Sequence, residues 1–263
     1  MPPALILDVD GTVWRSGRLI PGADRAIAQL RQAGHPILYL SNNPVAADTY
    51  AARLSDLGLP TEPGEVLTAF DITVTALERQ APGEKIYVLA DDALQRLLER
   101  RFPVSADPEQ IGIVLATGPY DLTFDRLNTA FQALRRGARL WATNADPSVV
   151  DRRYGEIPHT GAAIGALHGC TGRPVEVMTG KPSHLAAEAA LERLRCAPDQ
   201  AIVVGDSLDT DIELGRVAGI PSVLVLTGVT RREHLAAARA EPGRVLDSLA
   251  ELPLALQAGD LLG

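Results

Sequence analysis

The segment ALILDVDGT, residues 4–12, decides the fold. Its opening run of aliphatic residues predicts a strand buried on both faces, as in a parallel sheet. Asp8 and Asp10 stand where that strand should end, and Gly11 then allows a turn. Ligands of open α/β sheets bind at the carboxyl ends of the strands, so the two carboxylates indicate a ligand site. The segment alone leaves open an Asp-Gly turn whose carboxylates are merely solvated.

The same pattern of short aliphatic runs alternating with helical periodicity continues along the chain. It predicts an α/β fold with a Rossmann-like parallel sheet and helices on both faces. In the outer parts of the chain we expect strands at residues 4–9, 36–40, 201–204 and 221–225, and helices at 23–32, 45–57, 70–80 and 210–218.

A second alternating set begins after Pro82-Gly83 and closes near residues 174–177. This block is long enough to form a domain of its own. We therefore predict a core made of residues 1–80 and 178–263, and an inserted α/β domain made of residues 81–177. Within the insertion we expect strands at residues 86–89, 111–115 and 139–141, and helices at 93–101 and 124–136.

The composition is that of an average globular chain. The 263 residues include 25 Lys and Arg against 33 Asp and Glu, a net charge of −8, with 46% apolar residues and a mean hydropathy of +0.05. This excludes intrinsic disorder and lacks the basic footprint of a nucleic-acid binder. Neither a signal peptide nor an apolar run of about 18 residues is present, so we expect a cytoplasmic protein without a membrane span. Cys170 and Cys196 fit no metal or redox spacing and are expected to be buried thiols.

Polar or charged residues also stand at the ends of three further elements in the outer segments. The SNN of residues 41–43 follows the second strand, Lys181 precedes a helix, and an acidic group at residues 206–211 follows the strand 201–204. Taken singly, these are a turn, a solvated lysine and acids that suit a helix N-terminus. Converging on one sheet edge with the Asp8–Asp10 pair, they predict a magnesium-assisted phosphoryl-transfer site.

Three other chemistries are disfavoured. A phosphate-binding G-x-x-x-x-G-K motif would need glycine where Val175 stands. A nucleophile elbow around Ser207 would need glycine where Asp209 stands. The five histidines show no spacing typical of a metal site.

These elements, in this order, resemble the motifs of the haloacid dehalogenase superfamily: DVDGT at residues 8–12, SNN at 41–43, Lys181, and GDSLDTD at 205–211. Residues 10–23 and 140–144 are similar to a narrower, NagD-like group of capped p-nitrophenyl, phosphoglycolate and sugar phosphatases. The resemblance covers nearly the whole chain and implies that the inserted domain is the α/β cap of that group. The chain departs from the pattern at Pro44 and at residues 116–121, ATGPYD.

The resemblance implies a role for each motif residue. Asp8 would be the nucleophile that forms an aspartyl-phosphate, and Lys181 would supply positive charge in the reaction. Asp10 would be the acid and base, which requires that partial burial and the neighbouring carboxylate favour its protonated form. Mg²⁺ would be held by Asp8, Asp206 and the Asp10 carbonyl, with Asp211 holding a metal-bound water, while Asp209 faces solvent. Thr12 would orient Asp10, and the residues assigned to substrate and phosphate binding are Thr12, Ser41, Asn42 and Asn43.

The leading hypothesis is a Mg²⁺-dependent hydrolase that acts on phosphomonoesters of small metabolites through an aspartyl-phosphate. A phosphotransferase or phosphomutase would use the same site and pass the phosphoryl group to a second hydroxyl. A receiver-like module would accept phosphate on an aspartate and switch partners without catalysis. The expected partner is a small phosphorylated metabolite, with no nucleic acid and no membrane, and a homodimer formed through the cap is left open.

Overall fold

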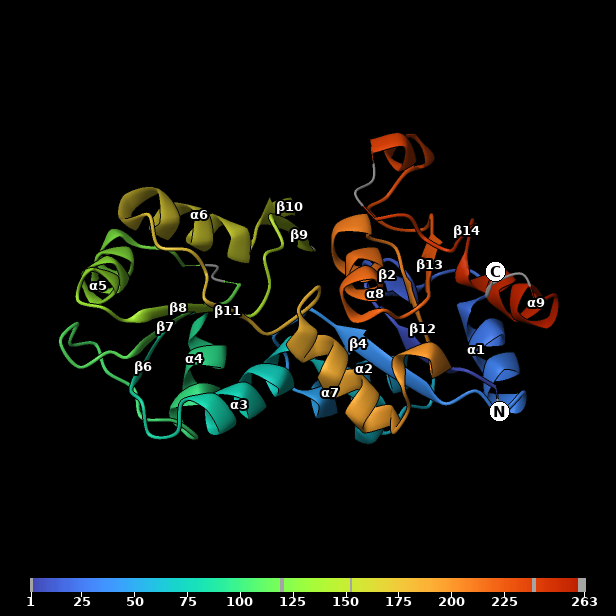
Figure 1. The fold of residues 1–263 in the computed structure, drawn as a ribbon, viewed down its shortest axis with the longest axis horizontal. Coiled ribbons are helices and arrows are strands. Elements are labelled where there is room, and N and C mark those ends of the chain that lie inside the picture. Colours follow the sequence, from blue (N-terminus) through green and yellow to red (C-terminus); the bar gives the residue numbers. More distant parts are fainter. Residues whose placement is uncertain (1, 119–120, 152, 238–239, 260–263) are drawn as a thin grey trace. The chain divides into compact units, whose positions relative to one another are not determined.

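The computed structural model describes residues 2–118, 121–151, 153–237 and 240–259 (Figure 1). The chain forms two compact units. The core unit comprises Met1–Ser41, Ala46–Thr68 and Lys181–Gly263, and the inserted unit comprises Asn42–Val45 and Ala69–Gly180. The division therefore falls at Ala69, and not at the Pro82-Gly83 turn used to place the boundary from the sequence. Helix α3 (Ala69–Gln80) follows strand β5 (Val66–Thr68) without any intervening turn residue, so no sequence signal marks the change.

The core unit is built on a six-stranded sheet in the order β14-β13-β12-β1-β4-β5, and every pairing in it is parallel. Its buried aliphatic strands confirm the α/β class predicted from the sequence. The strands are β1 (Ala4–Leu7), β4 (Ile37–Ser41), β5, β12 (Ala201–Gly205), β13 (Ser222–Val225) and β14 (Arg244–Leu246). A small hairpin, β2 (Trp14–Arg15) and β3 (Arg18–Leu19), follows β1.

The chain runs along this sheet in two directions from β1. Helix α1 (Ala23–Gln32) leads from β1 to β4, whereas α8 (Glu213–Ala218) leads from β12 to β13 on the other side of β1. Because crossovers between parallel strands are right-handed as a rule, connections that run in opposite directions are expected to cover opposite faces of the sheet, which agrees with the prediction. The direction changes between β1 and β12, which is where ligands bind in such sheets. The remaining helices are α2 (Ala47–Asp56), α7 (His184–Leu194) and α9 (Leu252–Gln257), with 3₁₀ turns at Pro63–Glu65, Pro198–Gln200, Arg232–Ala237 and Leu249–Glu251.

The inserted unit has its own parallel sheet, in the order β11-β8-β7-β6. Helices α5 and α6 contribute Ala130, Leu134, Ala163 and Leu167 to a buried cluster that also contains Leu140 of β8. The sequence did not predict α6, because its run of small residues shows no clear apolar stripe. The elements are β6 (Ile86–Leu89), β7 (Ile113–Ala116), β8 (Arg139–Ala142), β11 (Val177–Met178), α3, α4 (Asp92–Glu99), α5 (Phe124–Arg135), α6 (Thr160–Thr171) and the hairpin β9 (Ser148–Asp151) with β10 (Gly155–Pro158).

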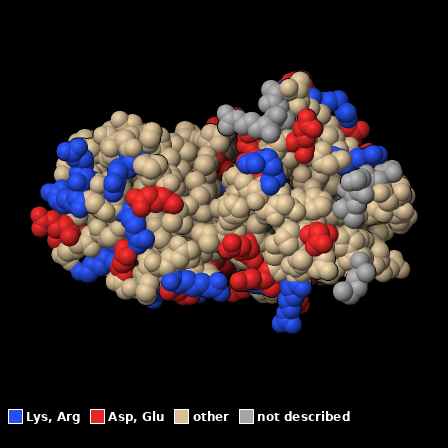
Figure 2. All heavy atoms as spheres, in the orientation of Figure 1, with Lys and Arg blue, Asp and Glu red and all other residues tan. Residues whose placement is uncertain are grey.

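The structure also bears on what the sequence predicted for the two cysteines, for a membrane span and for a basic surface. Cys170 is exposed and Cys196 is half-buried, so the prediction of two buried thiols was wrong. Cys170 lies near the end of α6, the helix that the sequence did not predict. Within the described ranges, none of the helices has the length and apolar character needed to cross a bilayer. On the face drawn in Figure 2, basic and acidic side chains are interspersed.

Candidate active site

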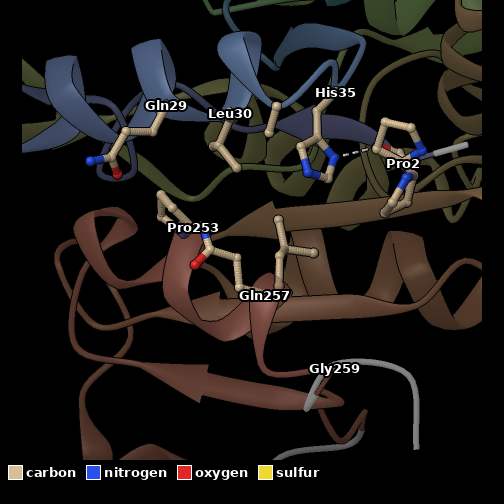
Figure 3. Close-up of a pocket in the computed structure, with 10 residues that line it drawn as sticks. Pro2, Gln29, Leu30, His35, Pro253, Gln257 and Gly259 are labelled. Carbon is tan, nitrogen blue, oxygen red and sulfur yellow. Dashed lines mark hydrogen bonds between the residues drawn. The ribbon is translucent and has the colours of Figure 1, made fainter.

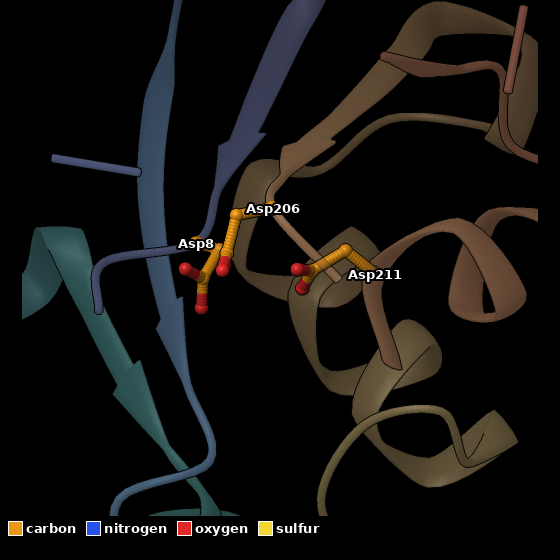
Figure 4. A group of neighbouring side chains, drawn as sticks. All are labelled: Asp8, Asp206 and Asp211. Atoms are coloured by element: carbon orange, nitrogen blue, oxygen red, sulfur yellow. The ribbon is translucent and has the colours of Figure 1, made fainter. Parts of the chain in front are cut away.

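Three carboxylates meet where β1 and β12 end. Leu7 pairs with Val204 in adjacent parallel strands, so Asp8 and Asp206 leave the sheet close together. Asp211 lies on the π-helical turn Leu208–Ile212 that precedes α8, and not on a regular helix beginning at Thr210 as the periodicity had predicted. The three side chains are buried, and ligand-capable oxygens from all three lie within 4.8 Å of one another (Figure 4).

Glycines leave the space that these carboxylates fill. A Cβ on Gly11 would lie 2.5 Å from Asp206 Oδ2, and the backbone φ of +103° at Gly11 is itself unfavourable for other residues. A Cβ on Gly228 would also overlap Asp206, and one on Gly205 would overlap Asp211. The close approach of backbone and carboxylates therefore depends on glycine at these three positions.

Lys181 is the buried cation of this cluster. Its Nζ lies 2.5 Å from Asp8 Oδ1 and 2.7 Å from Asp211 Oδ1, and the residue is only 3% exposed. Burial opposes the charged ammonium, but the carboxylates of Asp211 and Asp8 outweigh burial and raise the pKa of Lys181 above its ordinary value. The lysine therefore stays protonated. Ser183 follows it and caps α7 by accepting a hydrogen bond from the Ala186 N–H.

Three carboxyl groups and one lysine side chain meet at this site. Burial raises the pKa of Asp8, and burial together with the Asp8 charge raises the pKa of Asp206 to about 8. Burial also raises the pKa of Asp211, to about 6, although Lys181 opposes the shift. Asp8 Oδ2 is buried and has no hydrogen-bond partner among the described residues. Burial and mutual repulsion disfavour full ionisation of these carboxyls, and a hard divalent cation such as Mg²⁺, which prefers oxygen ligands, would offset that cost.

The loop after β13 holds Asp206 in place. The Val229 N–H donates to Asp206 Oδ2 over 2.6 Å, and the Thr230 N–H donates to the Asp206 carbonyl over 3.2 Å. Thr227 Oγ1 donates to the Gly11 carbonyl over 2.6 Å, which links this loop to the turn after β1. The sequence reasoning missed this loop, although a Thr-Gly pair following a predicted strand was an available signal.

Asp10 is held by an aromatic pair. Trp14 Nε1 donates to Asp10 Oδ1 over 2.7 Å, and the Tyr50 hydroxyl donates to Asp10 Oδ2. Ser41 Oγ in turn donates to Tyr50 Oη over 3.1 Å. Burial and the Asp10 charge raise the pKa of Tyr50 well above its ordinary value, so its phenol stays a donor. Sequence reasoning had expected Asp10 to be partly buried, but the residue is exposed at the turn after β1.

Thr12 does not supply the expected contact with Asp10. Its side chain is fully buried, and Oγ1 has no hydrogen-bond partner within the described part of the chain. The expectation that Thr12 orients Asp10 was therefore wrong, because the donors to that carboxylate come from Trp14 and Tyr50.

The SNN residues are divided between the two units. Ser41 ends β4 in the core unit, whereas Asn42 and Asn43 belong to the inserted unit, as does Pro44. Asn42 Nδ2 lies 3.3 Å from Asp146 Oδ1, and Asn144 Nδ2 donates to the Asn42 carbonyl over 3.0 Å. The phosphate-binding roles of this segment stay predictions.

Asp209 is exposed, as expected.

A separate hollow of about 280 Å³ lies between α1, α9 and the start of β1 (Figure 3). Proline, leucine and glutamine side chains line most of it, and His35 Nδ1 lies 2.8 Å from the Pro3 carbonyl oxygen. His35 is the one ionisable side chain among the described lining residues, so this hollow offers no chemistry comparable with the Asp8 site.

Comparison with known proteins places the chain in a family. Models described as haloacid dehalogenase-like hydrolase and HAD-hydrolase-like match residues 5–101 and 178–252. Sugar-phosphatase AraL of Bacillus subtilis is 32% identical over 99% of this chain and 96% of that protein. A p-nitrophenyl phosphatase from Archaeoglobus fulgidus superposes with a TM-score of 0.88 at 31% identity, covering 97% of this chain and 99% of that one.

A glycerol phosphate phosphatase from Mycobacterium tuberculosis, solved in complex with magnesium, superposes with a TM-score of 0.84 at 30% identity. The match covers 95% of this chain and 76% of that one. Similarity of this extent, together with the buried Asp8, Asp206 and Asp211 cluster, confirms the resemblance found in the sequence. The chain belongs to the haloacid dehalogenase-like hydrolases, in their NagD-like group of p-nitrophenyl and sugar phosphatases.

Proposed function

We propose that the protein hydrolyses phosphomonoesters of small metabolites through an aspartyl-phosphate on Asp8, with Mg²⁺ as cofactor. The observation that carries this proposal is the difference between the contacts of the two Asp8 carboxylate oxygens. Oδ1 contacts Lys181, whereas Oδ2 is buried and has no hydrogen-bond partner among the residues described. A fixed carboxylate with one uncommitted oxygen is suited to nucleophilic attack on phosphorus.

Two steps follow from this arrangement. Asp8 Oδ2 attacks phosphorus and forms an acyl-phosphate bond, the ester P–O bond breaks, and Asp10 gives its proton to the departing oxygen. Asp10 then takes a proton from water, whose oxygen attacks phosphorus, and the acyl-phosphate bond breaks to restore the Asp8 carboxylate and release phosphate. Lys181 holds the orientation of Asp8 and offsets negative charge as the two anions approach.

The same residues would hold the metal. Asp8, Asp206 and the Asp10 carbonyl are the proposed Mg²⁺ ligands, and Asp211 is proposed to hold a metal-bound water. When bound, Mg²⁺ offsets negative charge on the phosphoryl oxygens. We propose that Thr12, Ser41, Asn42 and Asn43 contact substrate or phosphate.

The substrate class rests on the relatives. The similar proteins are a sugar phosphatase, a p-nitrophenyl phosphatase and a glycerol phosphate phosphatase, which all take small phosphate esters. We extend this class to the present chain, and we keep a cytoplasmic location as part of the proposal.

The proposal is tested with p-nitrophenyl phosphate and a panel of phosphorylated metabolites, in buffer with Mg²⁺ and no acceptor alcohol. Sustained release of inorganic phosphate is expected, with preference measured as kcat/KM. Transfer that requires a second hydroxyl would instead indicate a phosphotransferase. Phosphorylation of the protein without turnover would indicate a receiver-like module.

We predict that Mg²⁺ both activates and stabilises the protein. At ten times its Kd, Mg²⁺ should contribute about 1.4 kcal/mol, or roughly 3–6 °C in Tm for a chain of this size. Asp206→Asn should lose most of this shift, because it removes one of the proposed oxygen ligands. Thermal melts with and without Mg²⁺ measure the effect, and EDTA should abolish turnover.

Asp209→Asn is the matched control, since Asp209 follows the same strand but is exposed. It should keep the full Mg²⁺ shift. Undiminished turnover in EDTA, or an equal shift in both variants, would exclude the proposed metal site.

A further inference from the structure

We propose that Tyr50 is a positioning residue that fixes the Asp10 carboxylate for proton transfer. The inference rests on the proposed function, in which Asp10 acts as acid and base. It is carried by a chain of hydrogen bonds that runs from Ser41 to Tyr50 to Asp10, completed by Trp14 on the other carboxylate oxygen.

The exposed position of Asp10 explains why its carboxylate needs these hydrogen bonds. The residue is exposed on a turn, where packing alone does not restrict its side-chain torsions. Two donors from different elements, Trp14 on β2 and Tyr50 on α2, each bind one of its oxygens. Binding both oxygens fixes the carboxylate plane as well as its position. An ionised carboxylate has about four acceptor positions, so these two bonds leave room for the transferred proton.

Tyr50 is the more deeply buried member of this pair. It is fully buried, and its ring centroid lies 5.2 Å from that of Trp14 at an interplanar angle of 47°. Ser41 Oγ donates to its hydroxyl, which directs the phenol proton toward Asp10. A donor fixed by packing and by a second hydrogen bond can hold an exposed side chain in one orientation.

The consequence concerns the leaving group. Expulsion of an alkoxide needs a proton from Asp10, whereas p-nitrophenolate is stable enough to leave with little help. A misplaced acid therefore lowers the rate for alkyl esters and spares p-nitrophenyl phosphate. A general packing defect would lower both rates together.

The test compares kcat/KM for p-nitrophenyl phosphate and a series of alkyl phosphates in the wild type, Tyr50→Phe and Asp10→Asn. Tyr50→Phe keeps the buried ring and removes only the hydroxyl. We expect a loss of about 10- to 100-fold on alkyl phosphates and less than about threefold on p-nitrophenyl phosphate. Asp10→Asn should show the same selectivity with larger losses on alkyl phosphates.

Tyr39→Phe is the matched control. Tyr39 is an equally buried tyrosine on β4, outside the hydrogen-bond chain to Asp10, and its replacement should leave both activities unchanged. Should Tyr50→Phe fail to fold, Trp14→Phe removes the other donor to Asp10. That variant should show the same selective loss on alkyl phosphates.

The outcomes separate the two proposals. A wild type without turnover would overturn the proposed function itself. Equal losses on both substrate types in Asp10→Asn would overturn its acid role. If Asp10→Asn is selective but Tyr50→Phe, or Trp14→Phe in its place, loses nothing or loses equally on both substrate types, the positioning role alone is wrong.

Discussion

Asp8→Asn is expected to lower kcat for every phosphomonoester by at least about 10³-fold, because an amide cannot form the acyl-phosphate at a useful rate. The fold should persist. Burial raises the pKa of the Asp8 carboxyl, which means that its charge is disfavoured in the folded state, and a neutral amide of the same shape relieves that cost. The amide oxygen can still accept the hydrogen bond of Lys181.

Rapid-quench measurement of protein-bound phosphate checks the loss of the acyl-phosphate, and thermal melting checks that the fold persists. Asp209→Asn serves again as the control, with wild-type turnover expected from this exposed position. An Asp8→Asn variant with activity within tenfold of wild type would exclude the covalent mechanism. If the Asp8→Asn variant were inactive because it is unfolded, the result would indicate a structural role for the buried Asp8 carboxylate.

Lys181→Met is expected to reduce both stability and catalysis. Removing one partner from a buried ion pair leaves an uncompensated charge and lowers the free energy of unfolding by about 3–5 kcal/mol. Here the lysine contacts two buried carboxylates, Asp8 and Asp211. Loss of the charge facing the transferred phosphoryl group should lower kcat/KM by about 10²–10³-fold. The sequence implied a role for Lys181 in the reaction, and its burial in the structure adds the expected effect on folding.

Chemical denaturation in the absence of Mg²⁺ measures the stability change. Lys85→Met is a matched control, since Lys85 is the only other lysine in the sequence and its residue is exposed. A double variant, Lys181→Met with Asp211→Asn, should recover part of the stability and none of the activity. Unchanged stability in Lys181→Met would show that the ion pairs contribute nothing to folding.

The sequence by itself determined the α/β architecture and the kind of chemistry at the sheet edge. Runs such as residues 4–7 and 201–204 are aliphatic without alternation, which is typical of strands covered on both faces. Parallel strands end at the same edge, so Asp8 and Asp206 could be expected to meet without knowledge of the contacts. Both inferences need only local periodicity and the geometry of a parallel sheet.

Tertiary structure alone decided which side chains contact one another. Tyr50 lies 40 residues from Asp10, and Lys181 lies 173 residues from Asp8, so no local spacing encodes either hydrogen bond. The division of the chain at Ala69, inside an uninterrupted strand-to-helix connection, is likewise absent from the sequence pattern. Periodicity reports which face of an element is buried. The partners on that face, and the charge they carry, depend on how distant elements pack together.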